Sequence, residues 1–284
     1  MNILGSKVSR AVFGLALLIL SGVPAGAKDR TLKLGYDVYL GGLNIFYLDV
    51  NLRMDGNHYE IFGGGETKGF ARMMWRWAVQ ASAKGVVNGQ GIESVTYDVA
   101  TKRKGKDRKL RLTFSEDGAY SIIRSPKDSP DKRKSRKLPE SIPTGTLDPI
   151  SVSMAVASAA AKGAACGGKF PVFDGNRRYD LTFTSMGEEH LSKPGYSIFS
   201  GRAIRCSFAM KRISGFRLNR VALRFWDEAR LEPPQVWLGR LERSLPLVPI
   251  QFQADFNMGY MIIYLSKAEY GNRPLLVPAS QTKR

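Results

Sequence analysis

The chain has 284 residues but only two histidines and two cysteines. This scarcity leaves few ways to build a metal centre or a nucleophilic catalytic site, because both need clustered His, Cys or carboxylate side chains. His58 follows a predicted hairpin turn and His190 lies in the loop-like stretch 187–195, so we interpret both as surface histidines. No H-E-x-x-H, EF-hand or C-x-x-C spacing is present. The sequence therefore predicts no metal, no cofactor and no enzymatic activity; a hydrolase that uses His58 or His190 is the alternative.

Long apolar runs are also scarce. One of them, Ala11–Val23, follows Lys7 and Arg10 and precedes the small residues Ala25-Gly26-Ala27. This order is typical of a secretory signal peptide cleaved after Ala27. The run is shorter than the roughly 20 residues that span a bilayer, which makes an uncleaved anchor the weaker alternative. We therefore expect export to the periplasm, with residues 1–27 removed from the mature chain.

The two cysteines, Cys166 and Cys206, form an even pair in a chain that we expect to be exported. An oxidising compartment favours a disulfide between them, which would close a loop of roughly 40 residues and stabilise the fold by about 4 kcal/mol in the chain-entropy model. Two buried free thiols are the alternative. The bridge would join the end of a predicted helix to a strand-like run, 196–205.

Acidic residues are few relative to basic ones. The net charge is +18 for the whole chain and falls to +16 without Lys7 and Arg10. Most of the excess lies in two clusters, 102–111 and 132–137, which we place in loops. In an exported protein nucleic acid is not an expected partner, so these loops either contact an anionic membrane surface or are simply solvated. The candidate contact residues are Lys102, Arg103, Lys104, Lys106, Arg108, Lys109, Lys132, Arg133, Lys134, Arg136 and Lys137.

Turn signals recur along the chain. Asp-Gly pairs at 55–56, 117–118 and 174–175, the pair Gly41-Gly42 and the segment 257–259 each separate two strand-like runs. Such residues reach the positive φ angles of tight hairpins at low steric cost. The pattern predicts a mainly β protein: a long antiparallel meander that forms a curved sheet, either a half-barrel or a β-spiral. We interpret Gly63-Gly64-Gly65 as a bend or bulge, and 69–77 as a short helical turn that enters a strand.

One segment departs from the β pattern and predicts a covering helix over 149–162. Asp148 is placed to cap it, Pro149 occupies its first position, and Ile150, Met154, Ala157 and Ala161 fall on one face. Before it, the Pro-rich stretch 125–145 predicts a long loop between two halves of a single β-rich domain, 28–270. Residues 271–284 are expected to form a tail.

Several of these segments resemble a known family. Gly145-Thr146-Leu147-Asp148-Pro149, Val172–Leu181, the pair Cys166 and Cys206, and Pro246–Ile250 are similar to exported proteobacterial proteins of the domain-of-unknown-function family 3108. The resemblance covers most of the mature chain, although the two basic clusters are not family features. It implies an envelope location and a curved β architecture with a covering helix, and it implies no activity.

The four tryptophans, Trp75, Trp77, Trp226 and Trp237, either fill an ordinary core or line a site for an apolar ligand. We expect a non-enzymatic periplasmic protein that binds a lipid, another amphipathic ligand or a lipidated partner on its curved sheet. The alternative is an interaction protein that docks on anionic envelope surfaces through its basic loops. No oligomeric state follows from the sequence.

Overall fold

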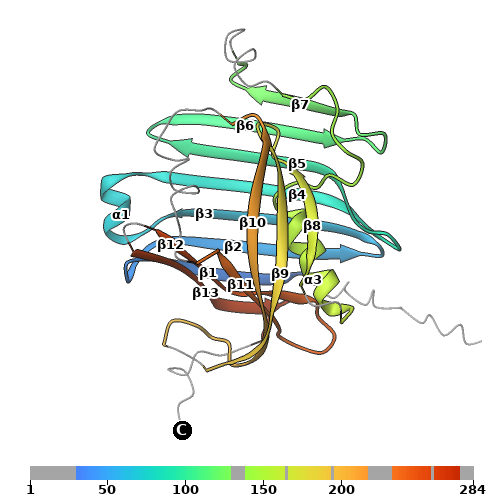
Figure 1. The fold of residues 1–284 in the computed structure, drawn as a ribbon. Helices are drawn as coiled ribbons and strands as arrows, with labels where there is room; N and C mark the ends of the chain where they lie inside the picture. The colour runs from blue at the N-terminus through green and yellow to red at the C-terminus, as the bar shows by residue number, and fades with distance from the viewer. Residues whose placement is uncertain are drawn as a thin grey trace, which may run out of the picture.

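The computed structural model describes residues 30–128, 138–163, 166–192, 195–216, 232–256 and 259–275; the predicted signal peptide, 1–27, lies outside these residues. Within them the chain forms 14 strands and two helices (Figure 1). No helix among them is long and apolar enough to cross a membrane. The elements are β1 (Leu32–Leu40), β2 (Leu43–Asp55), β3 (His58–Thr67), α1 (Gly69–Met74), β4 (Trp77–Asn88), β5 (Gly91–Arg103), β6 (Lys106–Phe114), β7 (Tyr120–Ser125), α3 (Ser151–Ala161), β8 (Gly168–Phe173), β9 (Arg178–Leu191), β10 (Gly201–Ser214), β11 (Gln235–Arg240), β12 (Leu247–Phe256), β13 (Gly259–Tyr270) and β14 (Arg273–Pro274).

All 14 strands belong to one antiparallel sheet, which confirms the predicted mainly β meander. The order runs from β7 back to β1, continues through β13, and ends at β8. The first and last long strands are therefore neighbours at the centre of the sheet, where Leu32 pairs with Tyr270 and Leu40 with Met261. Strands from both sides of the predicted loop 125–145 contribute to this one sheet. The sheet is not closed, because β7 and β8 remain as its edges.

The hairpin predictions are confirmed where the structure describes the turns. At Gly56, for example, φ is +59°, a conformation that glycine adopts without a Cβ clash, and Asp55 pairs directly with His58 across the turn. The helical turn predicted within 69–77 is α1, and β4 follows it. Residues 257–258 of the last predicted turn lie outside the described part of the chain.

The glycine triplet at 63–65 is not the predicted bend or bulge. All three residues lie inside β3 and pair without a register shift with β2 and β4. A Cβ on Gly65 would clash with the Phe46 ring and would lie 2.6 Å from Leu48 Cδ2. Glycine is present here because two β2 side chains fold over the backbone of β3, a close approach that any larger residue would prevent.

The sheet curls until its two ends face each other, and α3 lies between them (Figure 1). The helix contacts β4 and β5 on one side and β8 and β12 on the other. Side chains from α3, β1–β3, β5 and β8–β13 form one buried hydrophobic cluster. A second cluster packs Tyr97, Leu110 and Leu112 against Phe173 on β8. The edge of β8 is partly covered by the segment before α3, because Leu147 N donates to Pro171 O and Leu147 O accepts from Phe173 N.

The predicted helix at 149–162 is present as α3, and the four residues predicted to share one face differ in burial: Ile150 and Met154 are partly buried against the core. Of the four residues assigned to that face only Ala157 is buried, and Ala161 is exposed. The segment is alanine-rich on every side, so small apolar residues give no periodic signal to separate the faces. The residues that do face the core are Ser151, Val152, Ala155, Val156, Ala157 and Ala160.

The first turn of α3 is held by the fully buried carboxylate of Asp148, as the cap prediction requires. Asp148 Oδ1 accepts from the backbone N–H groups of Ile150 (2.8 Å) and Ser151 (2.9 Å). Its Oδ2 accepts from the hydroxyls of Ser151 and, at 2.7 Å, Ser94 on β5. Tyr59 on β3 donates to Ser151 Oγ at 2.6 Å, and burial raises the pKa of Tyr59 to about 12, so this donor keeps its proton. The network joins the start of the helix to two strands.

The other end of α3 is joined to the opposite end of the sheet. Cys166, just after the helix, and Cys206 on β10 lie at disulfide distance with their Cα atoms 6.0 Å apart. Both side chains are fully buried. The pairing therefore ties the helix to the second-half strands.

The predicted tail begins later than residue 271. Arg273 and Pro274 form β14, which pairs with the end of β13. The Arg273 guanidinium also makes a two-point ion pair with Glu242, at 2.6 and 2.9 Å. Backbone pairing and this ion pair fold the segment back on the sheet, and residues 276–284 lie outside the described part of the chain.

Replacing Asp148 by alanine should lower the free energy of unfolding by about 2–4 kcal/mol. The change removes a helix cap and leaves the buried Ser151 hydroxyl and the half-buried Ser94 hydroxyl without their acceptor. Ser153→Ala is the matched control, because Ser153 lies on the same turn but is exposed and bonds only to Ile150 O. Urea denaturation measures both; equal stability of the two variants would contradict the assigned role of Asp148.

The same carboxylate should give stability a pH dependence. Burial raises the pKa of Asp148, against the lowering effect of its hydrogen bonds from Ser151, Ser94 and Ile150. The folded chain thus binds this proton more tightly than the unfolded chain, and the resulting stability is present in acid and is lost as the pH rises through the raised pKa. The stability deficit of Asp148→Asn relative to wild type should therefore be largest in acid and shrink towards neutral pH.

Candidate functional site

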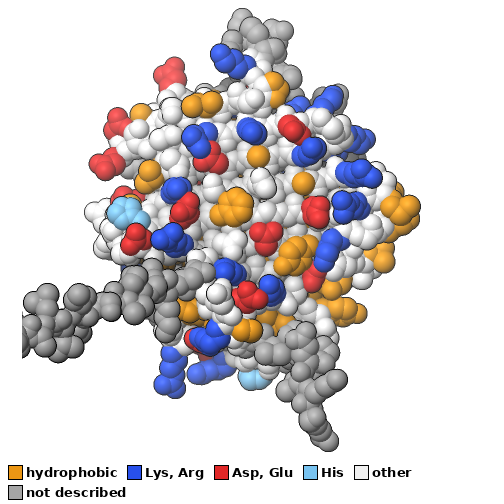
Figure 2. Space-filling model, turned by 180° about the vertical axis from the view of Figure 1, so that it is seen from behind, with side chains coloured by type: hydrophobic (Ala, Val, Ile, Leu, Met, Phe, Trp, Pro, Cys, Tyr) orange, Lys and Arg blue, Asp and Glu red, His pale blue; other side chains and the backbone are white. Residues whose placement is uncertain are grey.

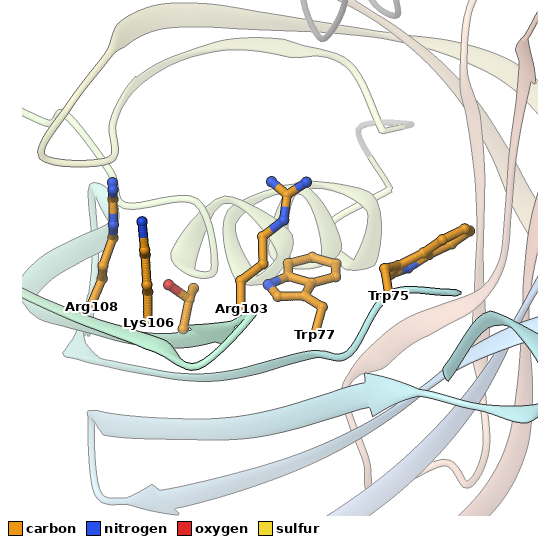
Figure 3. A pocket seen from close by; sticks show the side chains of 6 residues that line it. Trp75, Trp77, Arg103, Lys106 and Arg108 are labelled. Carbon is orange, nitrogen blue, oxygen red and sulfur yellow. The ribbon is translucent and has the colours of Figure 1, made fainter. Parts of the chain in front are cut away.

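A hollow of about 570 Å³ lies at one end of the concave face of the sheet. In Figure 3 the labelled side chains rise from the same side of neighbouring strands into this space, with α3 behind them. Two are tryptophans and three are cations. The lining residues are Trp75, Trp77, Thr101, Arg103, Lys106 and Arg108.

Strand alternation explains why the cations share a face. On β5, Tyr97 is buried in the core. Thr101 and Arg103 lie at even spacings from Tyr97, so their side chains are on the same face of the sheet, nearer the turn. On β6 the buried Leu110 and Leu112 set the same phase for Lys106 and Arg108. The apolar alternation of each strand therefore changes to a cationic one where the strands extend beyond the core.

The register brings these side chains together. Arg103 pairs directly with Lys106, Thr101 with Arg108, and Trp77 with Arg103. Directly opposed residues of an antiparallel pair have Cβ atoms about 5 Å apart. All the lining residues except Trp75 therefore lie on three adjacent strands, β4, β5 and β6, and Trp75 lies on the connection just before β4.

The two tryptophans are positioned by the connection between α1 and β4. Thr67, itself buried, donates its hydroxyl to Trp75 O at 3.0 Å and accepts from Trp77 N at 3.2 Å. The Trp77 ring also packs against Phe46, with centroids 5.1 Å apart. Trp75 and Trp77 nevertheless remain 37% and 39% exposed, so each offers an indole surface to the hollow.

The charge of the hollow is not compensated by neighbouring acids. Among the described residues, Arg103, Lys106 and Arg108 form no ion pair. Arg103 and Lys106 lie directly opposite each other, and like charges in this arrangement destabilise a sheet. An anion bound between them would relieve this repulsion. The arrangement is thus suited to a ligand with a negative group beside an apolar or aromatic one.

The turn between β5 and β6 adds another cation. Lys104 has φ +49° and is the one residue other than glycine with a positive φ in the described part of the chain. Gly105 follows with φ +73°. Positive φ at both central positions is the type I′ geometry, for which Asn-Gly is favoured and lysine is costly.

The first basic cluster is therefore not a loop, contrary to the sequence interpretation. Apart from Lys104 and Gly105 in the tight turn, its residues lie on β5 and β6, and alternation divides them between the two faces. Lys102 and Lys109 lie on the convex face, as does Arg111, which pairs with Asp98 at 2.6 Å. The Lys- and Arg-rich composition suggested a loop, but these strands need only one apolar face. The second cluster, Lys132, Arg133, Lys134, Arg136 and Lys137, lies outside the described residues.

The two histidines both lie on strands. His58 is the first residue of β3. His190 lies on β9, not in the predicted loop, and it pairs with Arg202 on β10. Both are exposed, as expected of surface histidines. In the part of the chain that the structure describes, no three His, Cys, Asp or Glu side chains group so that they could hold a metal ion.

The sequence left open whether the tryptophans fill the core or line a site; Trp75 and Trp77 line the hollow. Trp237 is buried in the core and donates Nε1–H to Glu189 at 2.9 Å, whereas Trp226 lies outside the described residues. The available signal was the alternation in 106–112, where Lys106 and Arg108 have the same parity as Leu110 and Leu112. It places both cations on the core side of the strand. No local signal places Trp77 beside them, because that depends on strand pairing.

These features define a class of proteins with a strongly curved antiparallel sheet around one helix. A beta-barrel-like protein of domain of unknown function DUF1849 from Brucella abortus, known from a crystal structure, has a similar fold, with a TM-score of 0.50. The match covers 86% of this chain and 99% of the other. At 11% identity it shows a shared fold alone.

The chain belongs to the family DUF3108, described as protein of unknown function, whose sequence profile matches residues 35–265. This confirms the family resemblance seen in the sequence. A comparison with curated proteins found no match to the chain.

Replacing Lys104 by asparagine should raise the free energy of unfolding by about 0.5–1 kcal/mol. Asparagine tolerates the left-handed conformation at this position better than lysine does, and the variant also removes one charge from a cationic turn. Urea denaturation measures the change, with Lys102→Asn on the adjacent strand as the control. A Lys104→Asn variant less stable than wild type would contradict the turn geometry.

Proposed function

We propose that this is a non-enzymatic protein of the periplasm that binds an anionic amphiphile in the hollow between Trp75, Trp77 and the three cations. The observation that carries the proposal is the pair of opposed like charges, Arg103 and Lys106, which have no acidic partner among the described residues. The fold tolerates this repulsion, and the binding of an anion between the two charges lowers the free energy by relieving it.

The two parts of the hollow suit the two parts of an amphiphile. Arg103, Lys106 and Arg108 provide donors for a phosphate or carboxylate headgroup. Trp75 and Trp77 provide aromatic surface against which an acyl chain packs, and burying that surface contributes about 25 cal/mol per Å². Neither part alone accounts for the residues that line the hollow.

The position of the hollow refines the expectation of a ligand on the curved sheet. The centre of the concave face is filled by α3 and the core side chains. A ligand therefore finds open surface at the end of this face, where Trp75, Trp77 and Arg103 line the hollow. Periplasmic placement is supported by the signal-peptide pattern of residues 1–27 and by the cysteine pair at disulfide distance.

The test is a titration of the mature chain with lysophosphatidylglycerol below its critical micelle concentration, followed by tryptophan fluorescence. Lysophosphatidylcholine with the same acyl chain is the comparison, because its headgroup has no net charge. We expect clear preference for the anionic lipid. Replacing Arg103, Lys106 and Arg108 with Gln should weaken that binding roughly 10- to 100-fold, at about 0.5–1 kcal/mol for each lost ion pair.

The matched control is Lys102→Gln with Lys109→Gln. These cations lie on the same two strands but on the convex face. Their replacement lowers the net charge of the protein similarly and should leave lysophosphatidylglycerol binding within about twofold of wild type. Equal losses in the two variants would show a general charge effect and contradict the assigned site.

A further inference from the structure

The helix α1 is a surface element whose apolar side chains point away from the protein. Of its six residues only Ala71 is buried. Phe70, Met73 and Met74 are 67%, 83% and 63% exposed, and Leu43 at the nearby start of β2 is 64% exposed. We call Leu43, Phe70, Met73 and Met74 the α1 tip. Exposed apolar side chains gathered in this way mark an interaction surface rather than an ordinary solvated turn.

The α1 tip is held in this orientation by the backbone on either side of it. Before the helix, Lys68 N donates to Ile45 O on β2 at 2.9 Å, and Lys68 Nζ pairs with Asp37 at 3.3 Å. After the helix, Trp75 N donates to Ala71 O at 2.9 Å. The exposure of the tip is therefore a property of a fixed local structure.

Cations surround the α1 tip. The segment 68–76 and the adjoining turn segment 102–109 contain nine basic residues, with Asp107 as their one acid. The two segments are adjacent because Trp77 pairs with Arg103. Viewed from behind, hydrophobic side chains gather at the right-hand edge of the molecule, where α1 lies, and Lys and Arg side chains run beside them (Figure 2).

We infer that the α1 tip docks on the surface of a bilayer that contains anionic lipid. Phenylalanine, methionine and leucine would enter the boundary between headgroups and acyl chains, as the apolar face of an interfacial helix does. The surrounding Lys and Arg side chains would contact the anionic headgroups, and the half-exposed indoles of Trp75 and Trp77 would lie at the depth that tryptophan favours.

Charge complementarity selects a membrane over a second copy of the chain. Two copies that met through the α1 tip would bring their cationic borders together, and that repulsion opposes self-association. An anionic lipid surface is attracted by the same border and accepts apolar side chains without a shaped pocket. The α1 tip itself lies outside the hollow, although its border shares Trp75, Trp77 and three cations of 102–109 with the hollow. The inference goes beyond the proposed function and is tested with variants of residues in or next to α1, none of which lines the hollow.

The test is co-sedimentation of the mature chain with vesicles of phosphatidylcholine containing phosphatidylglycerol, compared with phosphatidylcholine vesicles alone. We expect binding to the anionic vesicles that weakens as salt is raised. The variant Phe70→Ser, Met73→Ser, Met74→Ser should bind them at least 10-fold more weakly. The control Phe62→Ser with Ile123→Ser removes exposed apolar side chains elsewhere on the sheet and should bind as wild type does.

A second variant, Arg72→Glu with Arg76→Glu, keeps the apolar side chains and reverses charge on both sides of them. It should also lose vesicle binding at least 10-fold. Both variants change exposed residues, and circular dichroism checks that each is folded. Unchanged vesicle binding by the serine variant, or equal binding to both kinds of vesicle, would overturn the inference.

Two further measurements, of oligomeric state and of monomeric-lipid binding, separate the possible outcomes. If analytical ultracentrifugation finds a dimer that the serine variant abolishes, the α1 tip is a self-association surface and the membrane inference is wrong. If the serine variant loses vesicle binding but still binds monomeric lysophosphatidylglycerol, docking and the hollow are distinct, as inferred. Failure of wild type to bind the monomeric lipid would contradict the proposed function and leave the vesicle result to decide the docking inference.

Discussion

The fastening of α3 at both ends is the constraint on which the rest of the structure depends. At its start, the buried carboxylate of Asp148 joins the helix to Ser94 on β5. At its end, Cys166 joins it to Cys206 on β10. These strands belong to opposite ends of one open sheet, so the helix bridges a curve that no closing ladder of hydrogen bonds maintains. Direct packing of Phe173 on β8 against Tyr120 on β7 supports the same curve. A carboxylate without charge compensation is tolerated there because several donors meet it.

Filling the curve with α3 has a consequence for function. The middle of the concave face becomes core, and open surface is left where strands project beyond the helix. On β5 and β6, every second side chain still faces the concave side. Over the core these side chains are apolar, as at Tyr97 and Leu110, and beyond the core they are cationic, as at Arg103 and Lys106. The hollow is thus a by-product of strand length: the same two-residue period that buries one part of each strand presents cations at its end.

The local features of the fold and the pairing of Cys166 with Cys206 could be predicted from the sequence, whereas strand pairing between distant segments could not. Turns such as the one at Gly56 and the cap at Asp148 depend on neighbouring residues, so residue type alone indicated them. The pairing of Leu32 with Tyr270 depends on residues far apart in the chain and leaves no local signal. The cation cluster 102–111 was assigned to a loop because its composition is typical of a loop. The register of β5 with β4 and β6 is what brings its cations beside Trp77 in the hollow.

The most direct test of this account is nuclear magnetic resonance of the indole N–H groups while lysophosphatidylglycerol is added to the mature chain. Trp75 and Trp77 line the hollow, whereas Trp237 is buried in the core and bonds to Glu189, so one protein contains both probe and control. The account predicts that the Trp75 and Trp77 signals shift in a saturable manner while the Trp237 signal stays in place. Saturable binding that shifts Trp237 and leaves Trp75 and Trp77 unchanged would contradict it.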